Sequence, residues 1–306
     1  MLVKWALLGL SLGLLRVEAG RGRGSPSTTT PAPPPLPGPV DLTLALDRNA
    51  SSPEQPFTVT KNASAWGEFG WTSTQTSCSS GQAGTHMQAP YHLNEHGWKV
   101  DEVPLERLLV AAVLLDVSAE VAANGSFLLT ADHLIAWEKK HGGLPDNSVL
   151  LINFGTSAHG GARGASRNPS VTTTATPRTT PLNPGLSQGA AVHLTTLGRV
   201  VGVGVDLPAL DAVGTPRGRG EPAARALMAE NVYALLNLDL SRELPAKGFS
   251  LLVLPPKVRG AAVAPVRVVA TTRSPSPSRA AAAAVLPSTK MAIGTVLCLY
   301  LVQRQS

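Results

Sequence analysis

Apolar residues gather in short runs along the middle of the chain, at lengths typical of β-strands. Residues 41–46 alternate between polar and apolar positions, which predicts a half-buried strand. Four continuous apolar runs predict strands that are buried on both faces. These runs are residues 109–117, 148–154, 200–205 and 250–254.

Two segments between these runs have the features of helices. In residues 130–143, Thr130 is a suitable N-cap, Asp132 falls in the first turn, and basic residues precede a glycine. A second helix is expected over residues 223–236. Strands that alternate with helices predict an α/β or α+β domain with a mixed sheet.

Both ends of the chain differ in composition from this middle part. Residues 1–19 combine a basic start, a short apolar run and a small final residue, which predicts a secretory signal peptide. Residues 20–39 are a Pro/Ser/Thr-rich linker, and the folded domain is expected over residues 40–270. Residues 271–306 are a flexible tail whose apolar segment is too short to span a bilayer. Plain secretion is expected, with removal of the tail as a GPI signal as the alternative.

Three Asn-x-Ser sequons support export and predict N-glycosylation of Asn49, Asn62 and Asn124. The chain has only two cysteines, Cys78 and Cys298, so the fold is not a disulfide scaffold. Its stability must therefore come from a hydrophobic core.

The formal net charge of +6 does not predict nucleic-acid binding. The arginines are scattered through Gly-rich and Pro/Ser-rich segments without interleaved aromatic residues, so solvated loops explain them and no nucleic-acid partner is expected.

Residues 155–184 are rich in Gly, Ser, Thr, Arg and Pro. This composition predicts a low-complexity loop, and loops of this length are usually functional or disordered.

The stretch GTHMQAPYH, residues 84–92, places two histidines around a rigid Ala-Pro pair. Histidine is a common metal ligand, but a hydrolytic metal centre normally has three or more protein ligands, and the nearest candidates are Gln82 and Gln88. Two other functional motifs, a dinucleotide-binding fingerprint and a serine-nucleophile motif, are incomplete or absent in the sequence. The sequence GVGVD at residues 202–206 lacks the third glycine of a dinucleotide fingerprint, and no G-x-S-x-G motif is present.

The longer segment CSSGQAGTHMQAPYHLNEHGWKVDEVPLERLLVAAVLLDVS is similar to the signature region of the cyclase family, which includes kynurenine formamidases (arylformamidases) and isatin hydrolases. The family pattern is H-x-G-T-H-x-D-x-P-x-H followed by V-D-x-[IV]-P-L-E-R-L. Further matches lie at residues 182–187, 200–211, 231–238, 244–249 and 264–270. The resemblance spans residues 40–270 and implies the family's swivelling β/β/α fold with a mixed sheet, and a homo-oligomer.

The resemblance also implies a chemistry, which is metal-dependent amide hydrolysis with zinc or manganese, such as conversion of N-formylkynurenine to kynurenine in tryptophan catabolism. The family's metal-ligand positions fall on Gln82, His86, Gln88, Ala224 and Leu236. Only His86 keeps the family's residue type, while His92 keeps the acid/base position. Ala224 and Leu236 stand where a later helix of the family supplies a histidine and a glutamate, and neither has a side-chain donor atom.

Loss of even one outer-sphere partner costs about 10- to 100-fold in metal affinity or activity, so the loss of four direct ligands predicts that no stoichiometric metal is bound. The first hypothesis is a secreted homologue without the metal centre, which binds a small-molecule ligand or serves as a scaffold. The alternative is an active arylformamidase-type hydrolase with ligands from Gln82, His86, Gln88 and His92. A decayed or misassembled gene product is a third hypothesis.

Overall fold

The computed structural model describes residues 38–46, 57–157, 183–212 and 220–271. The predicted signal peptide, most of the predicted linker, Asn49, Cys298, most of the low-complexity loop and nearly all of the predicted tail lie outside these residues. None of the helices within them is long and apolar enough to cross a membrane.

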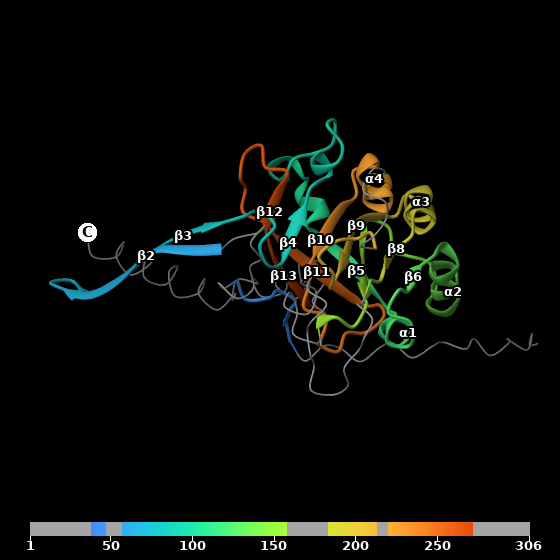
Figure 1. Cartoon of the computed structure of the whole chain (residues 1–306), viewed down its shortest axis with the longest axis horizontal. Helices are drawn as coiled ribbons and strands as arrows, with labels where there is room; N and C mark the ends of the chain where they lie inside the picture. Colours follow the sequence, from blue (N-terminus) through green and yellow to red (C-terminus); the bar gives the residue numbers. More distant parts are fainter. Residues whose placement is uncertain (1–37, 47–56, 158–182, 213–219, 272–306) are drawn as a thin grey trace, which may run out of the picture. The chain divides into compact units, whose positions relative to one another are not determined.

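The described residues form a mixed sheet of nine strands (Figure 1). In spatial order the strands are β1 (Val40–Asp41), β13 (Arg267–Thr271), β11 (Phe249–Leu254), β5 (Leu109–Asp116), β7 (Ser148–Asn153), β9 (Val200–Val205), β10 (Tyr233–Leu236), β4 (His86–Gln88) and β12 (Val263–Pro265). The central strands β5, β7, β9 and β10 pair in parallel, and every pair of neighbouring strands outside this group is antiparallel. The prediction of an α/β domain with a mixed sheet is therefore confirmed.

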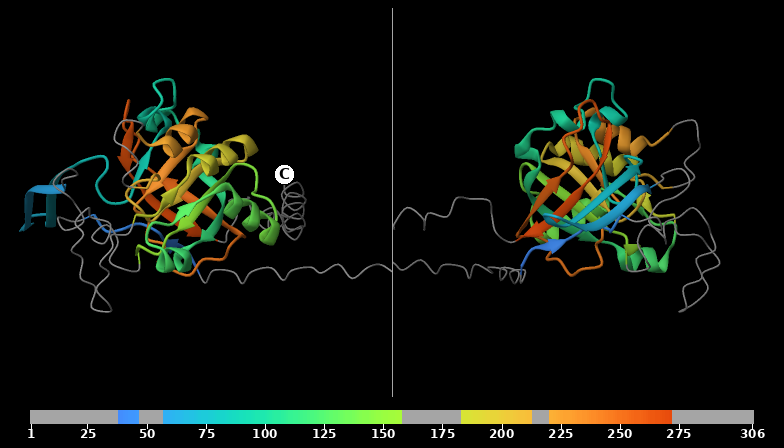
Figure 2. Two further views of the ribbon diagram at one scale, coloured as in Figure 1. Left: turned by 45° about the vertical axis from the view of Figure 1, so that its right-hand side comes forward. Right: turned by 90° about the vertical axis from the view of Figure 1, so that its left-hand side faces the viewer.

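The helices cover one face of this sheet (Figures 1 and 2). They are α1 (Ser118–Ala123), α2 (Ala131–His141), α3 (Gln188–Leu197) and α4 (Pro222–Ala229). Their buried residues share one hydrophobic cluster with alternate residues of the central strands, such as Leu150 and Ile152 of β7. The intervening Val149 and Leu151 belong to a second cluster on the other face. Because both faces are covered, the central strands are continuous apolar runs, as the sequence pattern indicated.

Short elements complete the described structure. Three 3-10 helices lie between β4 and β5, namely η1 (Pro90–His92), η2 (Val100–Glu102) and η3 (Leu105–Arg107). Two small sheets pair β6 (Leu128–Leu129) with β8 (Gly185–Leu186) and β2 (Phe57–Gly67) with β3 (Gly70–Ser79). The β2–β3 hairpin was not predicted, because neither strand contains a continuous apolar run.

The helix expected over residues 130–143 is confirmed as α2, with Thr130 as its N-cap. The helix expected over residues 223–236 is wrong in its second half. α4 ends at Ala229, Asn231 takes a left-handed conformation with φ 55°, and the chain continues as β10. An apolar run of this length suits both a helix and a buried strand, so periodicity alone did not reveal the break.

The strand expected over residues 41–46 is shorter than its alternating pattern suggested. Only Val40 and Asp41 pair in β1, and Thr43 forms a single bridge to Leu238. Of the sequons, Asn124 is exposed, and its side-chain oxygen accepts a hydrogen bond from the Ser126 amide at 3.1 Å. Asn62 lies in β2. Glycosylation stays a prediction.

Candidate functional site

The candidate site is at the carboxyl end of β10, where the antiparallel strand β4 passes beside it. His86 of β4 is directly opposite Leu236, the last residue of β10, and opposite Pro265 of β12. Ligands of α/β proteins bind preferentially outside the carboxyl ends of parallel strands. The histidine retained from the family motif therefore lies where this architecture commonly places a site.

His86 and Gln88 share one face of β4, because alternate residues of a strand point to the same side. Their cross-strand neighbours Leu236 and Ala234 belong to the hydrophobic cluster on the helix-bearing face. Met87, between them, belongs to the opposite cluster. The structure thus brings together three of the predicted ligand positions: His86, Gln88 and Leu236.

His86 is 1% exposed and neutral at physiological pH. Burial lowers the pKa of its imidazole to about 4, the hydrogen bond to Gly84 opposes this shift, and repulsion from His92 adds to it. Nδ1 lies 3.0 Å from the Gly84 carbonyl oxygen. Because a carbonyl only accepts, Nδ1 carries the proton and Nε2 has a free lone pair. Nε2 is buried and has no hydrogen-bond partner among the described residues.

Asn237 is a second buried polar residue at this place, and the sequence analysis did not select it as a site residue. Its side-chain NH₂ donates to the Gly84 carbonyl oxygen at 3.1 Å, and its main-chain oxygen accepts from the Thr85 hydroxyl at 2.6 Å. Its side-chain oxygen has no partner among the described residues. The signal for it was its place directly after the family's glutamate position, Leu236.

His92, the predicted acid/base residue, lies in η1 and is partly buried. Burial lowers the pKa of its imidazole, the Glu221 carboxylate opposes this shift, and the Arg225 guanidinium adds to it. The side-chain NH₂ of Asn94 donates to the Met228 carbonyl oxygen of α4 at 3.2 Å. This bond ties the segment after η1 to the helix that carries Ala224.

Ala224 and Leu236 are both buried, and the expectation that both stand in one later helix is wrong for Leu236. Ala224 is in the first turn of α4, where its amide donates to the Asp211 carboxylate at 3.0 Å. Leu236 ends the following strand, β10. Both side chains belong to the same hydrophobic cluster, together with Leu227 and Met228. At these two predicted ligand positions the chain has continuous apolar packing.

Gln82 and Gln88 do not compensate for this loss. Gln82 is partly buried just before the glycine turn. Its main-chain N–H donates to the Ser80 hydroxyl at 3.2 Å. Gln88 is 9% exposed in β4. Both side chains are neutral amides, which are weak ligands for zinc compared with imidazole or carboxylate.

These residues do not fit a zinc or manganese ion of the kind that the family uses. Such a site needs three or four nitrogen, sulfur or anionic oxygen ligands, whereas the five predicted ligand positions supply one imidazole, two neutral amides and two hydrocarbon side chains. Within the described ranges, no group of three or more His, Cys, Asp or Glu side chains could hold a metal ion.

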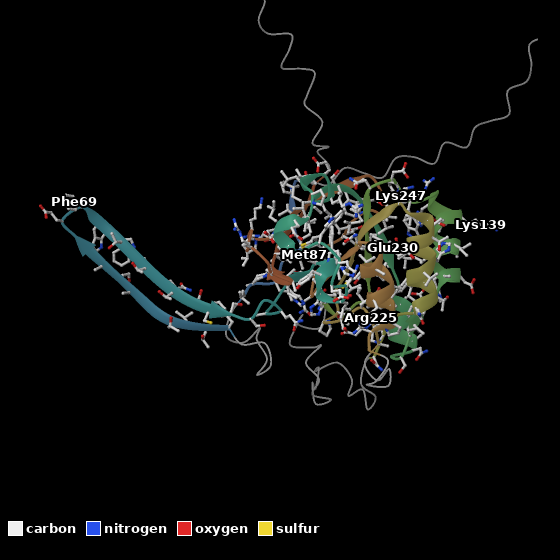
Figure 3. The ribbon with its side chains drawn as sticks, turned by 90° about the horizontal axis from the view of Figure 1, so that it is seen from above. Phe69, Met87, Lys139, Arg225, Glu230 and Lys247 are labelled. Atoms are coloured by element: carbon white, nitrogen blue, oxygen red, sulfur yellow. The ribbon has the colours of Figure 1, made fainter. Side chains whose placement is uncertain are left out.

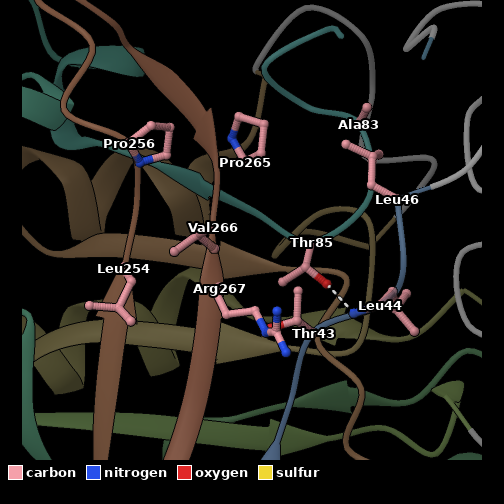
Figure 4. A pocket seen from close by; sticks show the side chains of 10 residues that line it. All are labelled: Thr43, Leu44, Leu46, Ala83, Thr85, Leu254, Pro256, Pro265, Val266 and Arg267. Atoms are coloured by element: carbon pink, nitrogen blue, oxygen red, sulfur yellow. Dashed lines mark hydrogen bonds between the residues drawn. The ribbon is translucent and has the colours of Figure 1, made fainter. Parts of the chain in front are cut away.

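Two surface cavities lie away from the predicted ligand positions. One, of about 200 Å³, is beside the start of β4 and has Thr85, Leu254 and Arg267 in its wall (Figure 4). The other, of about 360 Å³, is between α2 and the end of β5. None of His86, Gln88, His92, Ala224 and Leu236 lines either cavity.

The mixed sheet, the helices on one face and the candidate site at the carboxyl end of β10 define a mixed α/β protein. The family model described as "Putative cyclase" matches residues 40–212, and the chain belongs to this family.

Two relatives are similar in sequence. An isatin hydrolase from Roseibium aggregatum is 29% identical over 198 residues, which is 61% of this chain and 70% of the relative. A kynurenine formamidase from Salinibacter ruber is 27% identical over 186 residues, which is 61% of this chain and 74% of the relative.

Solved structures agree with this assignment. Isatin hydrolase A from Ralstonia solanacearum aligns with a TM-score of 0.64 at 28% identity, over 77% of this chain and 92% of its own. An isatin hydrolase bound to the product analogue thioisatinate aligns with a TM-score of 0.65 at 26% identity, over 76% and 91%. The fold class implied by the sequence resemblance is thereby confirmed.

Proposed function

We propose that this chain is a secreted member of the Cyclase family that has lost metal-dependent amide hydrolysis and acts as a binding or scaffold protein. Secretion rests on the sequence of residues 1–19 and on the sequons.

One observation carries the proposal. The side chains of Ala224 and Leu236, at two family ligand positions, are packed into one apolar cluster. Leu236 is directly opposite the retained His86, so a carboxylate at this position would face the imidazole. The leucine leaves the imidazole beside a hydrocarbon surface, where no negative charge offsets that of a divalent cation.

A second function is favoured by the free lone pair of His86. Because Nε2 is buried and unpartnered among the described residues, it is available to a metal ion or to a polar ligand. An active hydrolase would then have to complete its ligand set from Gln82, Gln88 and His92. The same experiment separates the two functions.

The experiment measures metal content and hydrolysis together. The purified chain, dialysed against zinc or manganese, is expected to retain no stoichiometric metal and to leave N-formylkynurenine and isatin unhydrolysed above the buffer rate. Stoichiometric metal that is lost in a His86→Asn variant, or metal-dependent hydrolysis by the unmodified chain, would contradict the proposal.

A restored variant tests the assignment of positions. Gln82→His, Gln88→Asp, Ala224→His and Leu236→Glu, introduced together, are expected to create zinc binding and measurable hydrolysis. The matched control replaces Leu236→Glu by Leu235→Glu, because Leu235 is equally buried but belongs to the cluster on the other face of the sheet. Equal metal binding by both folded variants would show that Leu236 is not the ligand position.

A further inference from the structure

The surface cavity of about 360 Å³ between α2 and the end of β5 lies outside the candidate site. Small-molecule sites usually occupy about 300–1,000 Å³ and combine an apolar wall with a few polar groups. This cavity has both. Its apolar wall comes from β5, from α2 and from the segment before β11, and consists of Leu114, Ala136, Trp137, Leu244 and Ala246.

The Trp137 indole has a fixed position in this wall. Its Nε1 donates to the Leu114 carbonyl oxygen at 3.0 Å, and its ring centroid is 5.0 Å from that of the His141 ring. The Lys247 ammonium, which is 5.8 Å from the indole centroid, donates to the His141 and Gly143 carbonyl oxygens at 3.2 and 2.8 Å (Lys247 is labelled in Figure 3). Because these contacts already order the indole, a flat ligand can pack against it with little further loss of side-chain entropy.

The side chains at the C-terminal end of α2 make this cavity attractive to an anion. Lys140 and His141 both line it, and Lys140 is exposed. Among the described residues, no carboxylate lies within ion-pair distance of the Lys140 ammonium. Burial lowers the pKa of the His141 imidazole, and the positive charges of Lys140 and Lys247 add to this shift. His141 is therefore a neutral hydrogen-bond donor beside an uncompensated positive charge.

A negative charge lies toward the other end of the cavity. Asp116, which lines the cavity, is paired with Asn153 at the carboxyl ends of the parallel strands β5 and β7. The short segment after His141 leads instead into the amino end of β7, so Lys140 and Asp116 lie toward opposite ends. The Asp116 carboxylate accepts from the Ser118 amide at 2.9 Å and from the Asn153 side-chain NH₂ at 3.0 Å. Its charge disfavours a second anionic group at that end.

We propose that this cavity binds a small planar aromatic monocarboxylate, with the ring against Trp137 and the carboxylate on Lys140 and His141. An aromatic ring suits a wall of indole and aliphatic side chains, because offset and edge-to-face ring pairs are favourable. One carboxylate matches the unpaired Lys140 ammonium, and Asp116 selects against a dicarboxylate. His86 does not line this cavity, so the proposal is independent of whether the chain hydrolyses amides.

Ligand-observed NMR of the full chain with naphthoate as the probe tests the proposal. For a ligand of this size, we expect a dissociation constant of about 1 mM. Lys140→Ala should weaken binding about fivefold, whereas Lys139→Ala should leave it unchanged. Lys139 is the matched control, because it is exposed on the same helix but does not line the cavity. His86→Asn should also leave naphthoate binding unchanged.

Two related probes test the recognition of charge. Naphthamide keeps the ring but has no charge, so it should bind the wild type about fivefold more weakly than naphthoate and bind Lys140→Ala as it binds the wild type. Naphthalene dicarboxylate should bind more weakly than naphthoate, and Asp116→Asn should remove this difference. The indole N–H resonance of Trp137, assigned from its absence in Trp137→Phe, should shift when naphthoate is added.

Several results would overturn the proposal. Naphthoate that does not bind at several times the expected dissociation constant, or that binds no more tightly than naphthamide, would exclude a carboxylate site. Equal weakening by Lys139→Ala and Lys140→Ala would show that the overall charge of α2, and not the cavity, attracts the probe. Binding that is lost in His86→Asn, or that leaves the Trp137 resonance unmoved, would place the probe elsewhere.

Discussion

Acid is expected to destabilise this protein through His86, and the size of the effect follows from its burial. The pKa of the imidazole is about 4 in the folded chain and 6.5 as the reference for the unfolded chain. The unfolded state therefore binds the proton more tightly. The contribution of His86 to stability is fully present above pH 6.5 and is lost as the pH falls toward 4.

The two pKa values give the magnitude. Between about pH 7 and pH 5, protonation of the unfolded imidazole should lower the free energy of unfolding by about 2 kcal/mol, and by about 3 kcal/mol near pH 4. This is a large share of the roughly 5–15 kcal/mol that stabilises a typical domain.

Urea unfolding at both pH values measures the effect, with EDTA present so that no metal competes for Nε2. His86→Asn is the comparison, because an asparagine amide can still donate to the Gly84 carbonyl oxygen but does not titrate. The wild type should lose about 2 kcal/mol more than this variant on acidification. His92, whose pKa is also lowered by burial, is present in both proteins, so most of its own contribution cancels in the comparison. An identical pH dependence of the two proteins would refute the reasoning.

Three further substitutions test the packing that positions the site. Asp206 accepts hydrogen bonds from the amides of Phe154 at 2.9 Å and Thr156 at 2.6 Å, so Asp206→Asn should cost about 3 kcal/mol in urea unfolding, against little for exposed Asp146→Asn. Gly202→Ala would bring a methyl group against the Tyr233 ring, and should lower the melting temperature by an amount equivalent to about 1–3 kcal/mol. Ser187→Ala removes the α3 N-cap, whose hydroxyl accepts from the Ala190 amide at 3.1 Å, and should cost about 1 kcal/mol of unfolding free energy.

Apolar runs and helix-capping residues predicted some elements of the fold correctly and missed others. The apolar runs predicted β5, β7, β9 and β11 to within one or two residues, because strands buried on both faces tolerate few polar residues. The capping signal at Thr130 predicted the start of α2. The boundary between α4 and β10 was missed, because it depends on the left-handed turn at Asn231 and not on apolar periodicity. The hairpin was missed because neither of its strands contains a continuous apolar run.

For the site, the sequence by itself determined which chemical groups are available. Gln88 in place of an aspartate, and the apolar residues Ala224 and Leu236 at two further positions, predict that the family's ligand set is incomplete. Only the tertiary structure showed that His86 and Leu236 are opposite one another, and that Asn237 shares the Gly84 carbonyl with His86. These residues are about 150 positions apart in the chain, and β-sheet pairing between distant segments sets their contact. Residue types limit the chemistry, whereas burial and strand register decide which lone pairs remain free.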